Sequence, residues 1–246
     1  MPKSSPPQLH VFPAADAVLR ALADFFVATA GQAVADHGRF AVALSGGSSP
    51  KKLYELLASP AYRPRVAWEK AYFFFGDERN VPQTSPDNNY LMAKTALFDP
   101  LGICPAQVFA VDTALAPAEA AAHYGLAIEE FFGAEEARFD LVLLGLGDNA
   151  HTASLFPHTP VLHDQTVGVK EVWLPEQQVF RITFTAPLLN QAWTTVFLVY
   201  GPDKAAAVQQ ILEFPRDVDQ YPAQLIAPAA GNVHWFLDEA AAAKLK

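Results

Sequence analysis

The chain has 246 residues, of which 51% are hydrophobic, and this is ample for the core of one large α/β domain. The formal net charge of −9 argues against a nucleic-acid partner, which would need a basic face, but allows an anionic small molecule if the few Arg and Lys residues converge in a cleft. The single cysteine, Cys104, excludes an internal disulfide and a cysteine-based zinc site, so we expect a cytoplasmic protein.

No membrane segment or targeting signal is predicted. The N-terminal stretch MPKSSPPQLHVF lacks the apolar centre of a signal peptide. No stretch approaches the roughly 20 apolar residues that a membrane span needs. We therefore expect a soluble protein with no membrane partner.

The first chemical signal follows an amphipathic helix expected over residues 14–36. Residues 40–44 predict a buried strand, a loop of small residues comes next, and a helix begins near Pro50. A helix N-terminus after such a loop points backbone N–H groups and the positive dipole end at one place, which suits a phosphate. The expected phosphate-binding residues are Ser45, Gly46, Gly47 and Ser48.

The sequence of this loop excludes one class of ligand and leaves one alternative interpretation open. Neither the dinucleotide fingerprint nor the Walker pattern is present, so we expect neither ATP nor NAD to bind here. An ordinary turn in which Ser48 or Ser49 caps the helix is the other interpretation.

Residues 71–79, AYFFFGDER, repeat the arrangement with charges. A buried aromatic strand ends at Gly76 and delivers Asp77, Glu78 and Arg79. Arg79 is expected to bind an anion, and Asp77 or Glu78 to orient it or to contact sugar hydroxyls. A solvated loop is the alternative. Further along, we expect a helix over 87–97, a strand over 107–112 and a helix over 117–132.

Residues 139–160, FDLVLLGLGDNAHTASLFPHTP, are the centre of the prediction. The apolar run 139–144 is typical of a parallel strand buried on both faces, and Gly145 and Gly147 let the backbone turn sharply after it. Ligands of open α/β sheets bind beyond the carboxyl ends of the strands, which is where His151 is expected. The alternative is a histidine that caps a helix.

The C-terminal third adds two cations. Strands are expected over 167–173, 180–185, 193–200 and 233–237, and helices from Gly201 and in the alanine-rich tail. Arg181 stands inside an apolar strand, where it needs a carboxylate or a bound anion. Lys204 is expected in a helix first turn, where an anionic ligand would offset the dipole, unless it is a plain surface lysine. The proline-rich segment 213–232, with a short helix at YPAQLI, is expected at the rim.

The summed βα pattern predicts a three-layer α/β fold, a mostly parallel sheet with helices on both faces. Because no linker or repeat divides the chain, we expect a single domain over residues 1–246.

Five strings occur in order: LSGGSSP, GDERNVP, GLGDNAHTASLFP, RITFT and GPDKA. Together they resemble the 6-phosphogluconolactonase family over about residues 10–240, and HTASLFP and DERNVP are specific to it within a superfamily that also holds sugar-phosphate isomerases and deaminases. The resemblance implies an isomerase/deaminase-like fold. It also implies hydrolysis of 6-phospho-D-glucono-1,5-lactone to 6-phospho-D-gluconate, the second step of the oxidative pentose phosphate pathway, without a cofactor.

The residues suit that chemistry. His151 can take a proton from water and return it to the departing ring oxygen, because the ordinary pKa of histidine lies near working pH. If the family's phosphate site carries over, its donors are the loop 45–49 with Arg79, Arg181 and Lys204. No covalent nucleophile is required.

The chain departs from the family before the histidine. Asn149 and Ala150 stand where an aspartate and a glycine are usual, and Asn88 replaces a serine. Asn149 and Asp148 are therefore both candidates for the residue that assists His151.

Other functions stay open at this stage: a sugar-phosphate isomerase or deaminase, and a non-catalytic sugar-phosphate sensor. A serine hydrolase is disfavoured because GxSxG is absent and Ser154 is only three residues from His151. His151, His158, His163 and Asp164 lack a metal-ligand spacing. We expect a monomer or a small homo-oligomer.

Overall fold

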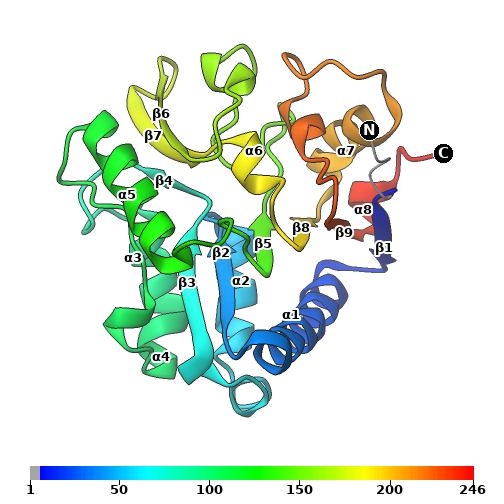
Figure 1. Cartoon of the computed structure of the whole chain (residues 1–246). Coiled ribbons are helices and arrows are strands. Elements are labelled where there is room, and N and C mark those ends of the chain that lie inside the picture. The colour runs from blue at the N-terminus through cyan, green and yellow to red at the C-terminus, as the bar shows by residue number, and fades with distance from the viewer. Residues whose placement is uncertain (1–5) are drawn as a thin grey trace.

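The computed structural model describes residues 6–246. The first five residues, which begin the N-terminal stretch analysed above for a signal peptide, lie outside the described residues. A six-stranded parallel sheet runs through the molecule (Figure 1) in the order β1-β9-β8-β5-β2-β3. Its strands are β1 (Gln8–Phe12), β2 (Phe40–Leu44), β3 (Ala71–Phe75), β5 (Leu141–Leu144), β8 (Thr194–Val199) and β9 (Asn232–Asp238).

The apolar runs form the centre of this sheet because both faces of the strands are covered. In β2, Phe40, Val42 and Leu44 pack in one core cluster, while Ala41 and Ala43 pack in the other. Successive side chains of a strand point to opposite faces, so a strand buried on both sides has no polar alternation. The expectation of buried parallel strands at residues 40–44 and 139–144 is confirmed, and β5 itself begins at Leu141.

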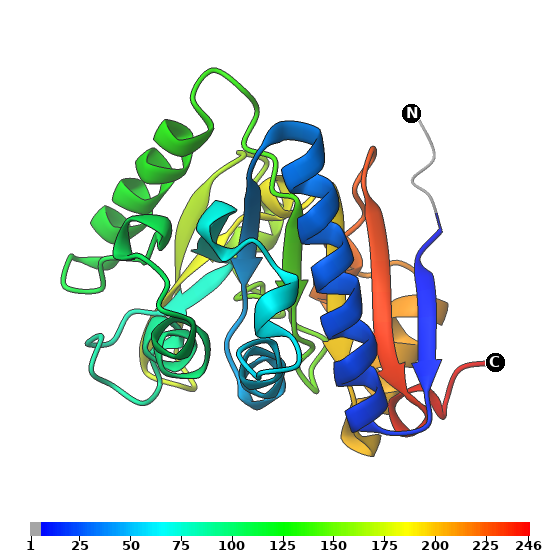
Figure 2. The same ribbon diagram turned by 90° about the horizontal axis from the view of Figure 1, so that it is seen from below.

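Helices cover both faces, as expected. Helices α1 (Ala15–His37) and α2 (Ser48–Leu57) contribute to one core cluster, and α5 (Pro117–Phe132), α7 (Ala205–Glu213) and α8 (Glu239–Ala242) to the other. Figure 2 shows α1 lying along the sheet. The shorter helices are α3 (Asn89–Ala93), the π-helix η3 (Lys94–Phe98), α4 (Asp99–Leu101), α6 (Ala186–Leu189) and the 3₁₀ turns η1 (Arg63–Arg65), η2 (Trp68–Lys70), η4 (Pro105–Gln107), η5 (Pro160–His163), η6 (Pro202–Lys204) and η7 (Pro222–Leu225).

A second sheet is antiparallel and was not foreseen. It has the order β4-β7-β6, with β4 (Asp77–Arg79), β6 (Val169–Leu174) and β7 (Val179–Phe184). Gly76 joins the two sheets, because its N–H donates to Leu44 O and its carbonyl oxygen accepts from Phe184 N, each at 2.9 Å. The charged triplet Asp77, Glu78 and Arg79 is therefore a strand rather than a solvated loop.

One predicted strand is absent, one predicted helix is present with shifted ends, and one strand was missed. Residues 107–112 form no strand: only Val108 bridges to Phe73 of β3, since η4 precedes it and the chain then leaves the sheet. The helix expected over 87–97 begins at Asn89, where Asn88 caps it, and changes to a π-helix at Lys94. Strand β1 had no prediction, because its paired register with β9 is a long-range contact.

Helix α1 needs a separate remark. With 23 residues and a mean hydropathy of 1.3 over 18 of them, it is by length and composition long enough to cross a membrane, contrary to the expectation from the sequence. Its apolar face, with Val18, Leu22 and Phe26, is fully buried against the sheet. Core helices pass the same test, and the packing here accounts for the composition.

Candidate active site

One cleft of about 450 Å³ lies where β2, β5 and β8 end. It brings together nine of the residues expected from the sequence, namely Ser45, Gly46, Gly47, Ser48, Asp77, Arg79, His151, Arg181 and Lys204. Asn149 and Asp148 do not line it. The carboxyl ends of parallel strands meet at one edge of a sheet, which is why segments far apart in the sequence converge here.

The phosphate-loop prediction fits the geometry of residues 45–48. Gly47, at φ 106°, precedes α2 as its N-cap and makes no side-chain cap bond, so the alternative in which Ser48 or Ser49 caps the helix is wrong. The first N–H groups of α2 have no intrahelical acceptor and open onto the cleft. The Ser45 Oγ is buried without a hydrogen-bond partner. The loop thus offers donors to an anion.

The loop is held from both sides by residues that sequence reasoning missed. The Tyr54 hydroxyl, fully buried in α2, accepts from Ser45 N at 3.1 Å and donates to Ser45 O at 2.8 Å. A Cβ at Gly46 would overlap the side chain of Asn89, so only glycine fits there. Asn89 in turn donates from Nδ2 to Asp77 O at 2.9 Å.

Two arginines face each other across the antiparallel sheet. Arg79 of β4 and Arg181 of β7 are direct partners in the register. Arg79 Nη1 donates to Asp87 O at 2.7 Å, and Arg181 Nη2 donates to Gln177 Oε1 at 2.5 Å. The Nε atoms of both arginines are buried without a partner. Like charges opposed on a sheet destabilise it, and an anion between them reverses the sign.

Arg181 also has the carboxylate that the sequence argument required. Its side chain is only 9% exposed, and Nη1 lies 4.0 Å from Asp77 Oδ2. Burial lowers the pKa of Arg181, and Asp77 opposes that shift. The pair is too long for a strong hydrogen bond, so the guanidinium keeps donors for a ligand.

The acidic residues near the cleft are largely occupied. Asp77 Oδ2 accepts a hydrogen bond from the buried Ser154 Oγ at 2.7 Å, so Ser154 supports the site and does not open onto it. Glu78 accepts from the backbone N–H groups of Arg79, Asn89 and Tyr90 at 2.7 to 2.9 Å. Burial raises the Glu78 pKa to about 7. Of the two acids considered for substrate contact, only Asp77 lines the cleft.

His151 is oriented by Asn149. Its Nδ1 lies 2.5 Å from Asn149 Oδ1, and the same oxygen accepts from His151 N at 3.3 Å. A carbonyl oxygen can only accept, so Nδ1 carries the proton and the lone pair is on Nε2. Within residues 6–246, the hydrogen bond of the His151 ring is made by Nδ1, and Nε2 makes none. Asp148 instead accepts from Asn149 N at 3.0 Å and does not touch the ring.

The surroundings of His151 keep it neutral. Burial lowers its pKa to about 4, while Asp77 acts in the opposite direction and Arg181 adds to the lowering. The ring stacks on Phe156 with centroids 3.9 Å apart. An imidazole that stays unprotonated at neutral pH is ready to accept a proton.

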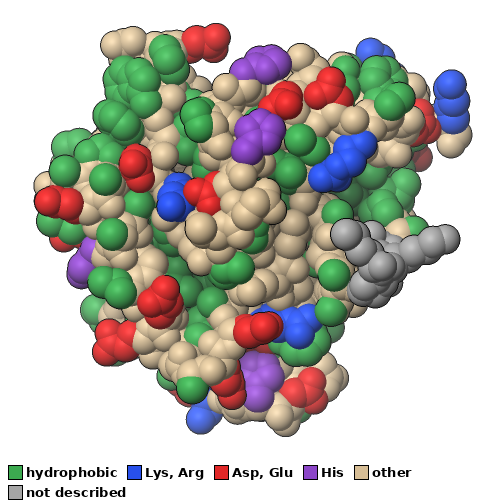
Figure 3. All heavy atoms as spheres, turned by 45° about the horizontal axis from the view of Figure 1, so that its top comes forward, with side chains coloured by type: hydrophobic (Ala, Val, Ile, Leu, Met, Phe, Trp, Pro, Cys, Tyr) green, Lys and Arg blue, Asp and Glu red, His purple; other side chains and the backbone are tan. Residues whose placement is uncertain are grey.

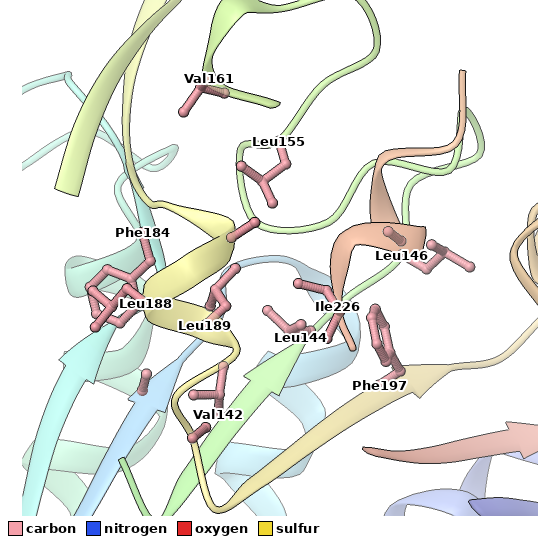
Figure 4. Packing of buried hydrophobic residues seen from close by; sticks show 14 of the residues in the cluster. Val142, Leu144, Leu146, Leu155, Val161, Phe184, Leu188, Leu189, Phe197 and Ile226 are labelled. Carbon is pink, nitrogen blue, oxygen red and sulfur yellow. The ribbon is translucent and has the colours of Figure 1, made fainter. Parts of the chain in front are cut away.

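The loop around His151 is irregular and is fixed by its core contacts, so the helix-cap alternative for His151 is wrong. Leu146 and Leu155, from either side of the histidine, are buried in the cluster that Figure 4 shows with Leu189 and Ile226. Burial of a leucine contributes about 1.5 to 3 kcal/mol. Ala150 has φ 63°, a conformation that glycine adopts without strain, and this explains why glycine is usual at that position in the family that the chain resembles.

Segment 213–232 supports this loop and does not cover the cleft. Ala223 N donates to Ala150 O at 3.0 Å, behind His151. Among the described residues, none of 213–232 lines the cleft itself, and a place for this segment at the outer rim stays a prediction. The short helix expected in YPAQLI is η7.

Lys204 lies in the cleft and, as expected, in the first helical turn after Gly201, which here is the 3₁₀ turn η6 that runs directly into α7. It ends η6 and stands at the N-cap position of α7, with Nζ 3.3 Å from Asp203 Oδ2. His163 pairs with Asp219 at 2.9 Å, and Asp164 with Lys170 at 3.5 Å. Among the described residues, no group of three or more His, Cys, Asp or Glu side chains is placed to hold a metal.

The face in Figure 3 carries its charges in small scattered groups. Within the part of the chain that the structure describes, that face has no continuous basic patch. The positive charge that matters to the site is the local convergence of Arg79, Arg181 and Lys204 in the cleft.

Comparisons with known proteins agree on one family. The family model described as glucosamine-6-phosphate isomerases/6-phosphogluconolactonase matches residues 13–235. The chain is 43% identical over 220 residues to the 6-phosphogluconolactonase of Synechocystis sp., with 87% of this chain and 88% of that one covered. It is 40% identical over 245 residues to the 6-phosphogluconolactonase of Nostoc sp., with 96% and 98% covered. The solved 6-phosphogluconolactonase from Trypanosoma cruzi superimposes with a TM-score of 0.87 at 27% identity, covering 99% of this chain and 98% of that one.

Proposed function

The chain belongs to the family of glucosamine-6-phosphate isomerases and 6-phosphogluconolactonases, and on that premise we propose that its cleft is a lactonase site in which His151 activates water. The enzyme hydrolyses 6-phospho-D-glucono-1,5-lactone to 6-phospho-D-gluconate, the second step of the oxidative pentose phosphate pathway. The relatives named above are 6-phosphogluconolactonases, which favours this activity over that of an isomerase or deaminase.

One observation carries the assignment of the site. An unprotonated histidine and an anion cradle share a single cleft. Asn149 fixes the Nδ1 proton of His151, so Nε2 is the free base, and the uncapped start of α2 with the opposed Arg79 and Arg181 supplies the anion donors. A phosphate in the cradle holds the sugar at a fixed distance from the base, and positioning of this kind lowers the barrier without covalent catalysis.

The reaction then needs one base. His151 Nε2 takes a proton from water while the water oxygen forms a bond to C1 of the lactone. The bond between C1 and the ring oxygen breaks, and the imidazolium returns the proton to that oxygen. The products are the C5 hydroxyl and a C1 carboxylic acid, which ionises. Asn149 orients the ring without stabilising the imidazolium as an aspartate would, and Asp148 acts only through its charge.

The phosphate donors have different characters. Ser45, Gly46, Gly47 and Ser48 supply hydroxyl and backbone groups, whereas Arg79, Arg181 and Lys204 supply charge. Asp77 lies 4.0 Å from Arg181 and lines the cleft, where it can contact a sugar hydroxyl.

The domain organisation, the cellular location and the oligomeric state are proposals as well. We infer one domain over residues 1–246, supported by a core cluster that includes Val142 of the large sheet and Phe184 of the small one. We also infer a cytoplasmic monomer or small homo-oligomer that binds neither nucleic acid nor membrane, supported by the acidic net charge and the single, free Cys104. Sedimentation of the purified protein tests the oligomeric state.

A direct assay tests the function. Freshly made 6-phosphogluconolactone is mixed with the protein, and the 6-phosphogluconate formed is measured against spontaneous hydrolysis. Glucosamine 6-phosphate is the matched control, because a deaminase releases ammonia from it. Binding of 6-phosphogluconate without turnover of the lactone would instead indicate a sugar-phosphate sensor.

A further inference from the structure

Gln177 is a cleft residue that the proposed reaction does not use. It lies in the turn between β6 and β7 and lines the cleft. Its Oε1 accepts a hydrogen bond from Arg181 Nη2 at 2.5 Å. The contact between a neutral amide and a buried guanidinium requires an explanation, because a carboxylate would bind the same guanidinium more strongly.

The hairpin turn holds Gln177 in place. Gln177 N donates to Leu174 O at 3.1 Å, closing the turn. The next residue, Gln178, has φ 51° and donates from Nε2 to Pro175 O at 2.6 Å. Two side-by-side glutamines therefore differ in direction: Gln177 reaches Arg181 in the cleft, and Gln178 bonds back to the turn.

The charges around Arg181 leave it free for an anion. Arg79 faces it across the sheet and adds positive charge. Asp77 is the nearest carboxylate, but its Oδ2 lies 4.0 Å away and already accepts from Ser154. Glu78 is turned to the backbone N–H groups of α3. A carboxylate at position 177 would therefore be the acid in direct contact with Arg181.

We propose that Gln177 is a positioning residue that sets substrate specificity: its neutral amide orients the Arg181 guanidinium for the substrate phosphate and leaves the positive charge uncancelled. The inference rests on the proposed function, since it names what selects the phosphorylated lactone over plain gluconolactone. An amide carbonyl can fix the guanidinium plane through one Nη2–H bond and leave the other Nη hydrogens for the phosphate.

The variant Gln177→Glu separates orientation from charge. Glutamate keeps an acceptor for Arg181 Nη2, so a contact that is merely structural survives or strengthens. Its carboxylate, however, repels the phosphate and competes for Arg181. We expect the ratio of kcat/KM for the phosphorylated lactone to that for gluconolactone to fall at least about tenfold, mainly through KM for the phosphorylated lactone.

Gln178→Glu is the matched control, because it makes the same charge change in the same turn without a contact to Arg181. The ratio of kcat/KM values for this variant should stay within about twofold, because residue 178 bonds back to Pro175 O and a charge there is not in contact with Arg181. Thermal melting checks that both variants fold. Should Gln177→Glu fail to fold, Gln177→Ala removes the orienting acceptor and should lower the ratio by a smaller factor, about threefold.

The outcomes are distinct. A ratio unchanged in Gln177→Glu, or lowered equally in both glutamate variants, overturns the inference while leaving the lactonase activity intact. An inactive wild type overturns the proposed function instead. Even then, calorimetric binding of 6-phosphogluconate decides the role of Gln177, because the two glutamate variants should still differ in affinity.

Discussion

Two loops of the cleft follow neighbouring strands of the same sheet and are built on opposite principles. Residues 45–47 come after β2 and run directly into α2, so their chemistry is that of backbone N–H groups at a helix start. Residues 145–159 come after β5 and form no helix, and their chemistry is one side chain, His151. A phosphate accepts many weak donors from several directions, whereas proton transfer needs one atom in one place.

The two loops are also stabilised differently. The first uses Gly47 at φ 106° and a glycine, Gly46, packed against Asn89. The second places alanines at positive φ, Ala150 at 63° and Ala153 at 46°, and compensates with buried side chains. Strain of this kind persists only where the surrounding structure over-determines the conformation. The difference indicates that the histidine loop is fixed mainly by core packing, whereas the phosphate loop is fixed by its glycines together with the contacts of Tyr54 and Asn89.

The largest expected effect comes from removing the side chain that carries the chemistry of the histidine loop. His151→Ala should lower kcat by about 10² to 10⁴, the usual cost of losing a general base. The affinity for 6-phosphogluconate should change only a few-fold, since the phosphate donors remain. Steady-state kinetics and calorimetry measure the two quantities. Turnover near that of the wild type would remove His151 from the mechanism.

Removing a charged donor from the phosphate side should have the opposite signature. Arg181→Ala should weaken 6-phosphogluconate binding by about 1.5 to 3 kcal/mol, the range for charged hydrogen bonds. The preference for the phosphorylated lactone over gluconolactone should narrow as well. Arg138→Ala is a control, because Arg138 packs on Trp193 away from the cleft. An unchanged preference in Arg181→Ala would make Arg181 structural.

The pH profile tests how the histidine loop is tuned. His151 must be neutral to accept a proton, and burial lowers its pKa to about 4, so activity through this group should be lost only as the pH falls toward that value. Asn149→Asp places a carboxylate next to the Nδ1–H group of His151, and this negative charge raises the His151 pKa. The acidic limb of the kcat/KM profile should therefore move to higher pH, by about one unit or more.

Asp148→Asn is the companion variant. The Asp148 charge raises the His151 pKa without touching the ring, so its removal should move the limb slightly to lower pH and leave the rate at neutral pH intact. A limb that stays in place in Asn149→Asp would mean that residue 149 does not contact His151 in solution. A large loss of activity in Asp148→Asn would transfer the helper role to Asp148.

The smallest effects compare the backbones of the two loops. Gly47→Ala puts an L-residue at φ 106° and ψ 173°, a region that only glycine readily adopts, and should cost about 1 to 3 kcal/mol of folding stability, with weaker phosphate binding. Ala153→Gly relieves a positive φ and should stabilise the protein by up to about 1 kcal/mol or leave it unchanged. Urea unfolding gives both values. Equal destabilisation by the two changes would contradict the distinction between the loops.

The sequence by itself determined the parts of this protein that depend on local chemistry. Apolar runs predicted the strands β2 and β5, and small residues predicted the phosphate loop. The histidine at 151 indicated a base, and the arginine at 181 indicated a residue that needs an anion beside it. The family was predicted from five short strings of neighbouring residues, which can be recognised without knowing the fold, and the family comparison confirms it. The roles of the site residues stay predictions until the variants are measured.

Only the tertiary structure decided which segments meet. That Arg79 faces Arg181 depends on a second, antiparallel sheet, whose pairing joins residues far apart in the chain. The same pairing gave strand character to the charged triplet, while residues 107–112 found no complete partner strand. Gln177 had no sequence signal, because a glutamine in a turn is ordinary until Arg181 is placed against it. Asn149 and Asp148 were equal candidates for the same reason, since a hydrogen bond depends on direction, and direction is set by the positive φ at Ala150 and the packing behind it.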